Sequence, residues 1–192
     1  CMASRLSDAS AIAIFPWGDV VEDFLGPLGL ELSDIVETMS GGWLFGYVEA
    51  LRFAGFRPVV ICASAAVQRS EHRIHRATGV SIWIVPGRSS ALPYSSRRSG
   101  AQWWRTPWRA FAAALRHERC TRMLVQEYEY ARFDALAVLG RLMKIDVFAT
   151  FQGGDQTLSR VEGWIRPWSL RLARGLAIAS SRERDRLHSA YR

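Results

Sequence analysis

The sequence predicts a doubly wound, Rossmann-like α/β fold: a mostly parallel β-sheet with helices on both faces, giving three layers. Short continuous apolar runs recur along the 192 residues and have the length of strands buried on both faces. Segments with helical periodicity separate these runs, and glycine or proline marks many of the boundaries. No run approaches the roughly 20 apolar residues of a membrane span. We therefore expect one layered domain over residues 1–192.

The apolar runs and the helical segments alternate along the whole chain. Strands are expected at residues 11–15, 59–63, 80–85, 123–127, 146–151 and 175–179. Helices are expected at residues 43–54, 67–78, 108–118, 132–144, 156–174 and from 181 to the end. Two long loops are expected, at about residues 16–40 and 86–107. Because a helical crossover returns the chain to the same edge of a sheet, this alternation predicts parallel strands.

The net charge of +7 is unevenly distributed. Residues 1–50 contain eight acidic residues and one basic residue, Arg5, whereas residues 88–122 contain eight arginines and one acidic residue, Glu118. Lys144 is the only lysine in the chain. Arginine favours planar, bidentate contact with phosphate or carboxylate. The acidic N-terminal segment argues against a uniformly basic face, so nucleic acid is not expected as a partner.

The basic segment also contains several tryptophans and tyrosines. Arg97 and Arg98 precede Trp103 and Trp104. Such a segment can stack on nucleic-acid bases, anchor at a membrane interface, or bind a glycan by stacking and hydrogen bonding. The tryptophans can also pack onto the core without any binding role. We take Arg97, Arg98, Trp103 and Trp104 as candidate acceptor-binding residues.

The cysteines and histidines do not indicate a metal site. Cys1, Cys62 and Cys120 lack the spacing of metal ligands, and two of them lie in or beside expected strands, where free cysteines act as small buried hydrophobes. His72 and His75 are three residues apart, which suits the solvated face of a helix better than an incomplete metal site. No signal-peptide pattern begins the chain. These features favour a reducing, cytoplasmic location.

Polar residues end one of the expected strands, and a glycine pair begins a helix. Gln126 and Glu127 end one strand, at the edge of the sheet where open α/β folds bind ligands. A buried Glu127 could act as an acid or base, although exposure or pairing with arginine is the commoner fate. Gly41 and Gly42 precede the helix at 43–54, where backbone N–H groups can hold a phosphate or simply form a cap.

A second strand end carries the sharpest motif. The apolar residues at 147–151 are followed by Gln152, Gly153, Gly154 and Asp155, and Asp155 occupies an expected helix N-cap position. A strand that leads into a glycine turn and a capped helix is how α/β folds hold polar or anionic ligands. No Gly-x-Gly-x-x-Gly follows the first strand, so a nicotinamide-dependent enzyme is not indicated.

Three segments together resemble the N-terminal, acceptor-side domain of GT-B glycosyltransferases of the retaining class called family 4. They are Ser40-Gly41-Gly42 with the following helix and Ala54-Gly55-Phe56-Arg57-Pro58, the turn at 148–155, and residues 173–187. The turn is similar to the Thr-x-His-Gly-x-Asp turn of that family.

The resemblance implies roles for several of these residues. Gly41 and Gly42 would approach the diphosphate of a nucleoside diphosphate sugar donor. Gln152, Gly153 and Asp155 would line the reaction centre, with Gln152 and Asp155 as the catalytic candidates. Gln152 stands where the family has histidine, and an amide can hydrogen-bond a sugar hydroxyl but cannot titrate. No metal or other cofactor is implied for this domain.

The resemblance also implies that the chain is one half of a GT-B architecture. The family's enzymes carry a second Rossmann-like domain that binds the donor nucleotide, and no such domain is expected within residues 1–192. The predicted function is therefore acceptor binding in transfer of a sugar, with retention, to a glycan, lipid-linked or anionic acceptor. The expected partners are that C-terminal domain or a separate subunit, and an anionic surface at the inner membrane face. The alternative is a non-catalytic module that binds a glycan or an anion.

Overall fold

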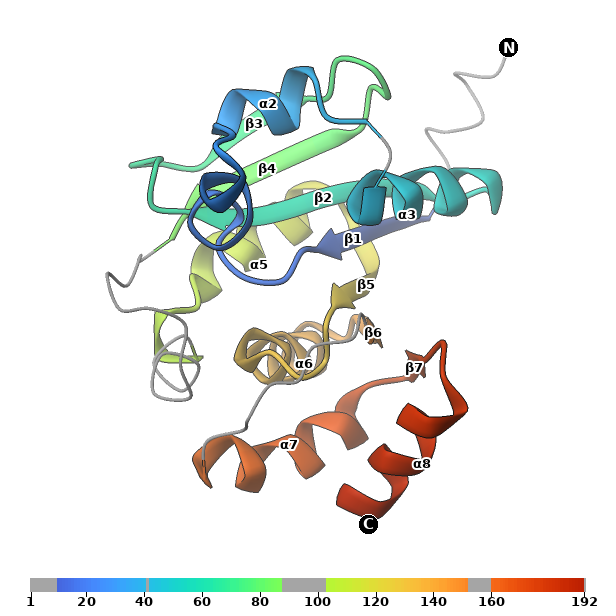
Figure 1. The fold of residues 1–192 in the computed structure, drawn as a ribbon. Coiled ribbons are helices and arrows are strands. Elements are labelled where there is room, and N and C mark those ends of the chain that lie inside the picture. The colour runs from blue at the N-terminus through green and yellow to red at the C-terminus, as the bar shows by residue number, and fades with distance from the viewer. Residues whose placement is uncertain (1–9, 41, 88–102, 152–159, 192) are drawn as a thin grey trace.

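The computed structural model describes residues 10–40, 42–87, 103–151 and 160–191. Within them, seven strands form one sheet in the order β3-β4-β2-β1-β5-β6-β7, with β3 antiparallel to β4 and every other pair parallel (Figure 1). The strands are β1 (Ala11–Phe15), β2 (Arg57–Ser64), β3 (Glu71–Ile74), β4 (Ser81–Pro86), β5 (Cys120–Gln126), β6 (Asp146–Thr150) and β7 (Gly175–Ala177). The predicted doubly wound α/β fold is confirmed.

Helices cover both faces of the sheet. One face is covered by the π-helical turn η1 (Val20–Leu25), α2 (Leu32–Glu37) and α3 (Gly42–Phe53). The 3-10 turn η2 (Gly26–Leu28) lies between η1 and α2 in the chain. The other face packs against α5 (Trp108–His117) and α6 (Ala131–Met143). Residues of α7 (Arg160–Leu172) and α8 (Ser181–Ala190) pack at the margin of this second core.

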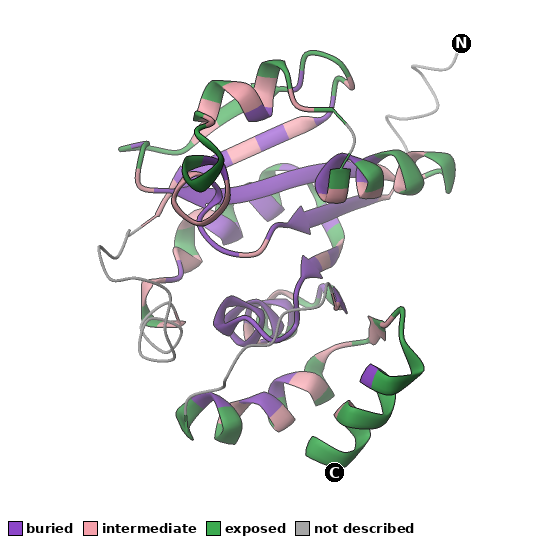
Figure 2. Ribbon diagram, in the orientation of Figure 1, coloured by how far each residue is buried: buried purple, intermediate pink, exposed green. Residues whose placement is uncertain are grey.

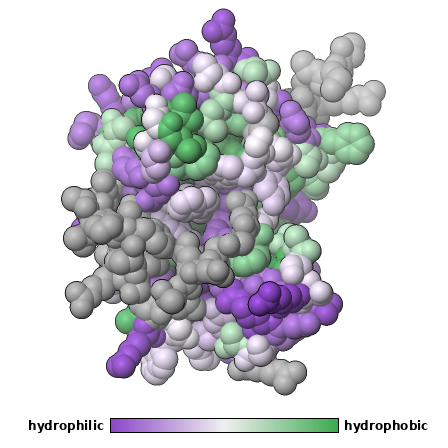
Figure 3. All heavy atoms as spheres, in the orientation of Figure 1, coloured by the Kyte–Doolittle hydropathy of each residue, from purple (hydrophilic) through white to green (hydrophobic). Residues whose placement is uncertain are grey.

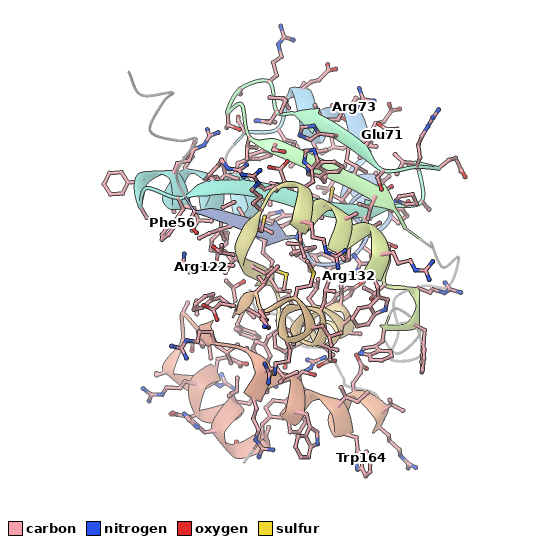
Figure 4. All side chains as sticks on the ribbon, turned by 180° about the vertical axis from the view of Figure 1, so that it is seen from behind. Phe56, Glu71, Arg73, Arg122, Arg132 and Trp164 are labelled. Carbon is pink, nitrogen blue, oxygen red and sulfur yellow. The ribbon has the colours of Figure 1, made fainter. Side chains whose placement is uncertain are left out.

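Alternating side chains of the central strands form the two cores. Ile14 and Val60 point to the α3 face, whereas Phe15 and Val125 point to the α6 face. Figure 2 shows β1 and β2 as almost continuously buried, which is the reason that their sequences are apolar without alternation. At the amino edge of the sheet, the Arg122 guanidinium lies over the Phe56 ring at 5.5 Å (Figure 4).

The prediction of a helix at residues 67–78 is wrong. This segment contains the edge strand β3, whose His72 pairs with Trp83 of β4 and stacks on it with ring centroids 4.8 Å apart. Glu71 and Arg73 are two residues apart, share one side of the strand and form an ion pair at 2.7 Å (Figure 4). Cross-strand pairing of this kind overrides a weak helical pattern.

Two further expectations need correction. His75 does not lie on a solvated helix face: it is fully buried, and its Nε2 is 2.8 Å from the carbonyl oxygen of Met39. The loop expected at about residues 16–40 contains η1, η2 and α2. Helix α2 begins at a capping box, in which the backbone N–H of Glu31 donates to Asp34 Oδ2 at 2.7 Å. In the sequence, the signal for this helix start was an acidic residue, Asp34, three residues after Glu31.

Candidate functional site

The order of the strands places a change of direction at the centre of the sheet. From β1 the chain adds β2 and then β4 on one side of the sheet. It then returns to place β5 on the other side of β1, and β6 pairs with β5. In open α/β sheets, ligands bind beyond the carboxyl ends of the strands that flank such a switch point. Residues 16–19 after β1 and 127–130 after β5 are therefore the structural candidates for a site.

The last residues of β5 and β6 carry the strongest indication of a ligand. Gln126 and Thr150 are register partners, so their side chains leave the sheet on the same face. Their exposed fractions are 0% and 1%. Gln126 Nε2 donates to the carbonyl oxygen of Trp43 at 3.1 Å. Gln126 Oε1 and Thr150 Oγ1 are buried with no hydrogen-bond partner in the described part of the chain. An unsatisfied buried group costs about 1–3 kcal/mol, so each oxygen is suited to a ligand.

The start of α3 lies beside this pair of oxygens. The hydrogen bond between Gln126 and Trp43 joins the end of β5 to the first turn of the 12-residue helix. Gly42, the first residue of α3, has φ 63°, and a Cβ there would meet no atom within 4 Å. A ligand can therefore approach the first N–H groups of the helix, which carry partial positive charge. The structure brings Gly42 and Gln126 together, and their binding roles stay predictions.

Glu127 turns the chain away from the sheet. It has the left-handed φ of 70° and is buried, and its Oε1 accepts the backbone N–H of Glu129 at 3.2 Å. A left-handed residue without a glycine is uncommon and persists where its surroundings hold it in place. Here Glu127 shapes the segment 127–130 through its own carboxylate, a role that the sequence-based alternatives of acid, base or exposed glutamate did not include.

A buried ion pair joins the residues after β1 to α6. Arg132 Nη2 donates to Asp19 Oδ1 at 2.6 Å, and Arg132 Nη1 donates to the carbonyl oxygen of Gly18. Burial lowers the pKa of the Arg132 guanidinium, but the charge of Asp19 and the hydrogen bond to it, together with the nearby Tyr130 and Asp23, raise that pKa above its ordinary value. Arg132 Nε is buried without a partner among the described residues, and Figure 4 shows this side chain between α5 and α6.

Sequence reasoning missed this ion pair. The polar and acidic residues that follow β1 were a usable signal, because they lie at the same edge of the sheet as Gln126. Arg132, 113 residues away from Asp19, gave no comparable signal.

A second polar cluster connects the segment after β5 to α8. Tyr128 Oη donates to Glu183 Oε1, while Arg186 Nη2 donates to Glu129, to Glu183 Oε1 at 2.6 Å and to Tyr128 Oη at 3.1 Å. Burial and the hydrogen bond to Glu183 raise the pKa of Tyr128, so the phenol stays protonated. The hydrogen bond from Arg186 lowers the pKa of Glu183, against its partial burial. Figure 3 shows hydrophilic residues gathered over α8, the helix that contains Glu183 and Arg186.

A third arginine holds α7 against α6. Arg166 Nε and Nη2 donate to the two oxygens of Asp134 at 2.8 and 2.9 Å, and Nη1 donates to the carbonyl oxygen of Tyr128. Both side chains are buried. Burial raises the pKa of Asp134 more than the charge of Arg166 lowers it. Arg166 thereby links two helices to the segment that follows β5.

The tryptophans of the basic segment lie at a different strand end. Trp104 lines a hollow of about 500 Å³ together with Arg105, Trp108 and the end of β4 at Pro86 and Gly87. Trp103 packs edge-on against Trp104 and Trp108, with ring centroids 4.9 and 5.8 Å apart. Because β4 is three strands from β5 and neighbouring strands are about 4.8 Å apart, this hollow is separate from the Gln126 site.

Several predicted site residues lie outside the described residues: Gly41, Arg97, Arg98, Gln152, Gly153 and Asp155. Phe151, which immediately precedes the predicted turn, is described. Its backbone N–H donates to the carbonyl oxygen of Ala177 at 3.2 Å, and its ring lies 5.8 Å from that of Tyr128. The strand that leads to the turn therefore ends beside the Tyr128 cluster.

Metal-ligand clusters and membrane-spanning helices are both absent from the described residues. In residues 10–40, 42–87, 103–151 and 160–191, no three His, Cys, Asp or Glu side chains gather as metal ligands would. Over the same part of the chain, no helix has the length and apolar character needed to cross a bilayer. Cys62 and Cys120 are free and buried, as predicted.

Comparison with known proteins supports the fold and leaves the family open. Neither a known family model nor a curated protein matches this sequence. Among solved structures, sucrose-phosphate synthase from Thermosynechococcus elongatus is similar, with a TM-score of 0.54 and 15% sequence identity. The match covers 94% of this chain and 45% of the synthase, so the chain spans less than half the length of that protein. It shares the fold of one half of a GT-B glycosyltransferase.

Proposed function

We propose that this chain is the acceptor-binding half of a glycosyltransferase similar to the retaining family 4 enzymes. In this proposal it helps to transfer a sugar from a nucleoside diphosphate sugar to a glycan, lipid-linked or anionic acceptor. The observation that carries the proposal is the pair of buried, unpartnered oxygens on Gln126 and Thr150 at the switch point, beside the open start of α3. The fold shared with sucrose-phosphate synthase supports the same class of reaction.

The chemistry of these groups suits a sugar and a diphosphate. The carbonyl Oε1 of Gln126 can accept a hydrogen bond from a sugar hydroxyl, and the Thr150 hydroxyl can donate or accept one. Neither group titrates near neutral pH, so their contribution is orientation rather than proton transfer. The N-terminus of α3 carries roughly half a positive charge and suits the donor diphosphate, with Gly41 and Gly42 giving close approach to the backbone.

Transfer with retention would then depend on position and charge. The acceptor hydroxyl would attack the sugar on the face from which the diphosphate leaves, and hydrogen bonds to the departing phosphate would lower the barrier. Gln152 and Asp155 are the proposed residues at the reacting sugar, where Gln152 supplies hydrogen bonding. A separate donor-binding domain or subunit would hold the nucleotide.

Ligand binding tests the site directly. Saturation-transfer NMR of the chain with a panel of nucleoside diphosphate sugars and oligosaccharides should detect a bound ligand. In Gln126→Leu/Thr150→Val, affinity should fall by about 10-fold or more, because a hydroxyl that loses a buried partner loses about 1–3 kcal/mol. Gln68→Leu, at an exposed glutamine, is the control and should leave affinity unchanged. Equal affinity of the double variant and the wild type would remove these residues from the site.

Turnover separates the enzyme from the alternative, a non-catalytic module that binds a glycan or an anion. The alternative is supported by the same geometry, since buried unpartnered oxygens beside the start of α3 can hold a glycan or an anion without any transfer. The protein together with its donor-binding domain should transfer labelled sugar to the acceptor identified by NMR. Binding without transfer, in the presence of that domain, would favour the module and contradict the enzyme.

A further inference from the structure

Helix α7 has its polar side inward and its apolar side outward. Its buried residues are Glu162, Arg166 and Ser169. Four large apolar side chains of the same helix are exposed, with exposed fractions of 62%, 84%, 68% and 39% for Val161, Trp164, Trp168 and Leu172. Helices at the surface of a globular domain normally show the opposite arrangement. Something apolar or amphipathic is therefore expected to cover the outer face of α7.

The exposed apolar residues form one continuous row. Positions 161, 164, 168 and 172 are spaced by three, four and four residues, which places them along one side of an α-helix. Figure 4 shows Trp164 at the outer margin of the molecule, directed away from the body of the fold. We call these four residues the α7 stripe.

Basic residues adjoin the stripe. A hollow of about 360 Å³ lies where α6 and α7 end, and its lining includes four basic residues and one acidic residue: Arg141, Lys144, Arg171, Arg174 and Asp146. The guanidinium of Arg171 lies 5.3 Å from the ring centroid of Trp168, so the hollow and the stripe are continuous. None of the four basic side chains has an acidic partner among the described residues.

We propose that the α7 stripe and this basic hollow together form a docking surface for an anionic lipid membrane. Tryptophan favours the boundary between headgroups and acyl chains, where its ring is buried and its N–H stays hydrated. Unpaired arginine and lysine beside such a row attract anionic headgroups. The surface therefore combines the apolar and electrostatic contributions that hold a peripheral protein on a membrane.

Charge and area favour a membrane over a protein partner. The four stripe residues expose on the order of 500 Å² of side chain, below the roughly 800 Å² that each partner of a standard protein interface buries. Insertion of two tryptophans into a lipid interface needs no complementary protein shape. A second copy of the chain would bring like charges together at Arg141 and Arg174, which opposes self-association.

This surface differs from the membrane contact that the sequence predicted at Trp103 and Trp104. Those tryptophans lie before α5 and beside β4, whereas the stripe lies on α7, which follows β6 and packs on α6. The inference does not depend on sugar transfer, so its test stands apart from the test of the proposed function.

Vesicle co-sedimentation of the 192-residue protein tests the surface. The probes are vesicles of phosphatidylcholine alone and vesicles in which about one third of the lipid is phosphatidylglycerol. The wild type should partition onto the anionic vesicles and much less onto the neutral ones. Trp164→Ser/Trp168→Ser should lower the partition coefficient by about 10-fold or more. Arg141→Glu/Arg174→Glu should lower it by at least a similar factor, since each basic residue near an anionic surface contributes about 5-fold.

Each variant has a matched control elsewhere on the molecule. Leu28→Ser/Phe53→Ser removes two other exposed apolar side chains, and Arg69→Glu/Arg116→Glu makes the same change in net charge at exposed positions. Both controls should stay within about 2-fold of the wild type. Circular dichroism melting shows whether each variant is folded.

Three results would overturn the proposal. The first is a folded Trp164→Ser/Trp168→Ser variant that partitions onto anionic vesicles as strongly as the wild type. The second is a control variant that loses as much partitioning as the variant with which it is matched. The third is a dimer in sedimentation velocity that the tryptophan variant dissociates, with no binding to anionic vesicles; a second copy of the chain would then cover the stripe.

Discussion

Replacing Arg166 with leucine should destabilise the fold by about 3–5 kcal/mol, the usual result of leaving a buried carboxylate without its cation. The structure supports a value in this range, because the side chains of Arg166 and Asp134 are 0% and 1% exposed. Arg166→Leu removes both hydrogen bonds to Asp134 and the one to the carbonyl oxygen of Tyr128. For a chain of this length the melting temperature should fall by roughly 10 °C.

The destabilisation should shrink as the pH falls. The pKa of Asp134 is raised above the ordinary value of 3.8 by burial, and it is held down by Arg166. Loss of Arg166 raises this pKa further. A carboxyl group whose pKa is higher in the folded state favours folding when protonated, and this contribution is lost as the pH rises through the folded pKa. The difference in unfolding free energy between wild type and variant should therefore be smaller near pH 5 than at pH 7.

Urea denaturation at the two pH values measures these differences, and two further variants make the result specific. Arg160→Leu makes the same change at an exposed position of the same helix and should alter stability by less than about 0.5 kcal/mol. Arg166→Leu/Asp134→Leu removes both charges and should be at least about 2 kcal/mol more stable than Arg166→Leu. A cost of less than about 1 kcal/mol for Arg166→Leu would contradict this prediction, and so would a double variant that is no more stable than Arg166→Leu.

Two smaller predictions concern buried positions. Gly140→Ala should destabilise the fold by about 1–2 kcal/mol, because the new methyl group would lie 2.2 Å from Val147 Cγ2. This overpacking outweighs the gain of up to about 1 kcal/mol in helix propensity. A variant with unchanged or higher stability in urea would contradict the prediction. Burial raises the pKa of the Cys62 and Cys120 thiols to about 12, so iodoacetamide at neutral pH should leave both unmodified in the native protein and label both in urea. Peptide mapping checks this, and labelling of either residue before unfolding would be evidence against it.

The strands were within reach of the sequence because buried parallel strands are apolar without alternation, whereas the switch point follows from the strand order that the structure shows. Residues 11–15 were predicted to the residue, and the other five expected strands were found with shifted ends. β3 was missed because its pairing with Trp83 depends on a partner on another strand. Gln126 and Gly42 each carry a local pattern, and the fold brings them together, while their binding roles stay predictions.

The rest of the site depends on contacts between distant residues. Arg132 pairs with Asp19 across 113 residues, and Arg166 with Asp134 across 32, and neither pair has a local motif. Helix α7 was predicted, but its orientation was not. Hydrophobic periodicity places a row of Val, Trp and Leu against the core, whereas the structure turns Arg166 inward to reach Asp134. A single buried polar pairing thus outweighs the hydrophobic pattern of a whole helix.

Three arginines hold the segments that follow β1 and β5. Arg132 on α6 binds the residues after β1, Arg166 on α7 binds the carbonyl oxygen of Tyr128, and Arg186 on α8 binds Tyr128 and Glu129. Buried ion pairs such as those of Arg132 and Arg166 stabilise a fold little more than well-packed apolar side chains would, so their benefit lies in fixing the position of the segments that they contact. A ligand edge held in this way pays less conformational entropy on binding.

The double variant Arg166→Leu/Asp134→Leu separates position from stability. If the arginines mainly position the edge of the sheet, this variant should stay folded but bind the ligand found for the Gln126 site several-fold more weakly than the wild type. Unchanged affinity in a folded double variant would show that Arg166 serves the packing of α7 alone. The ligand edge would then be held by the other two arginines, whose partners lie directly after β1 and β5.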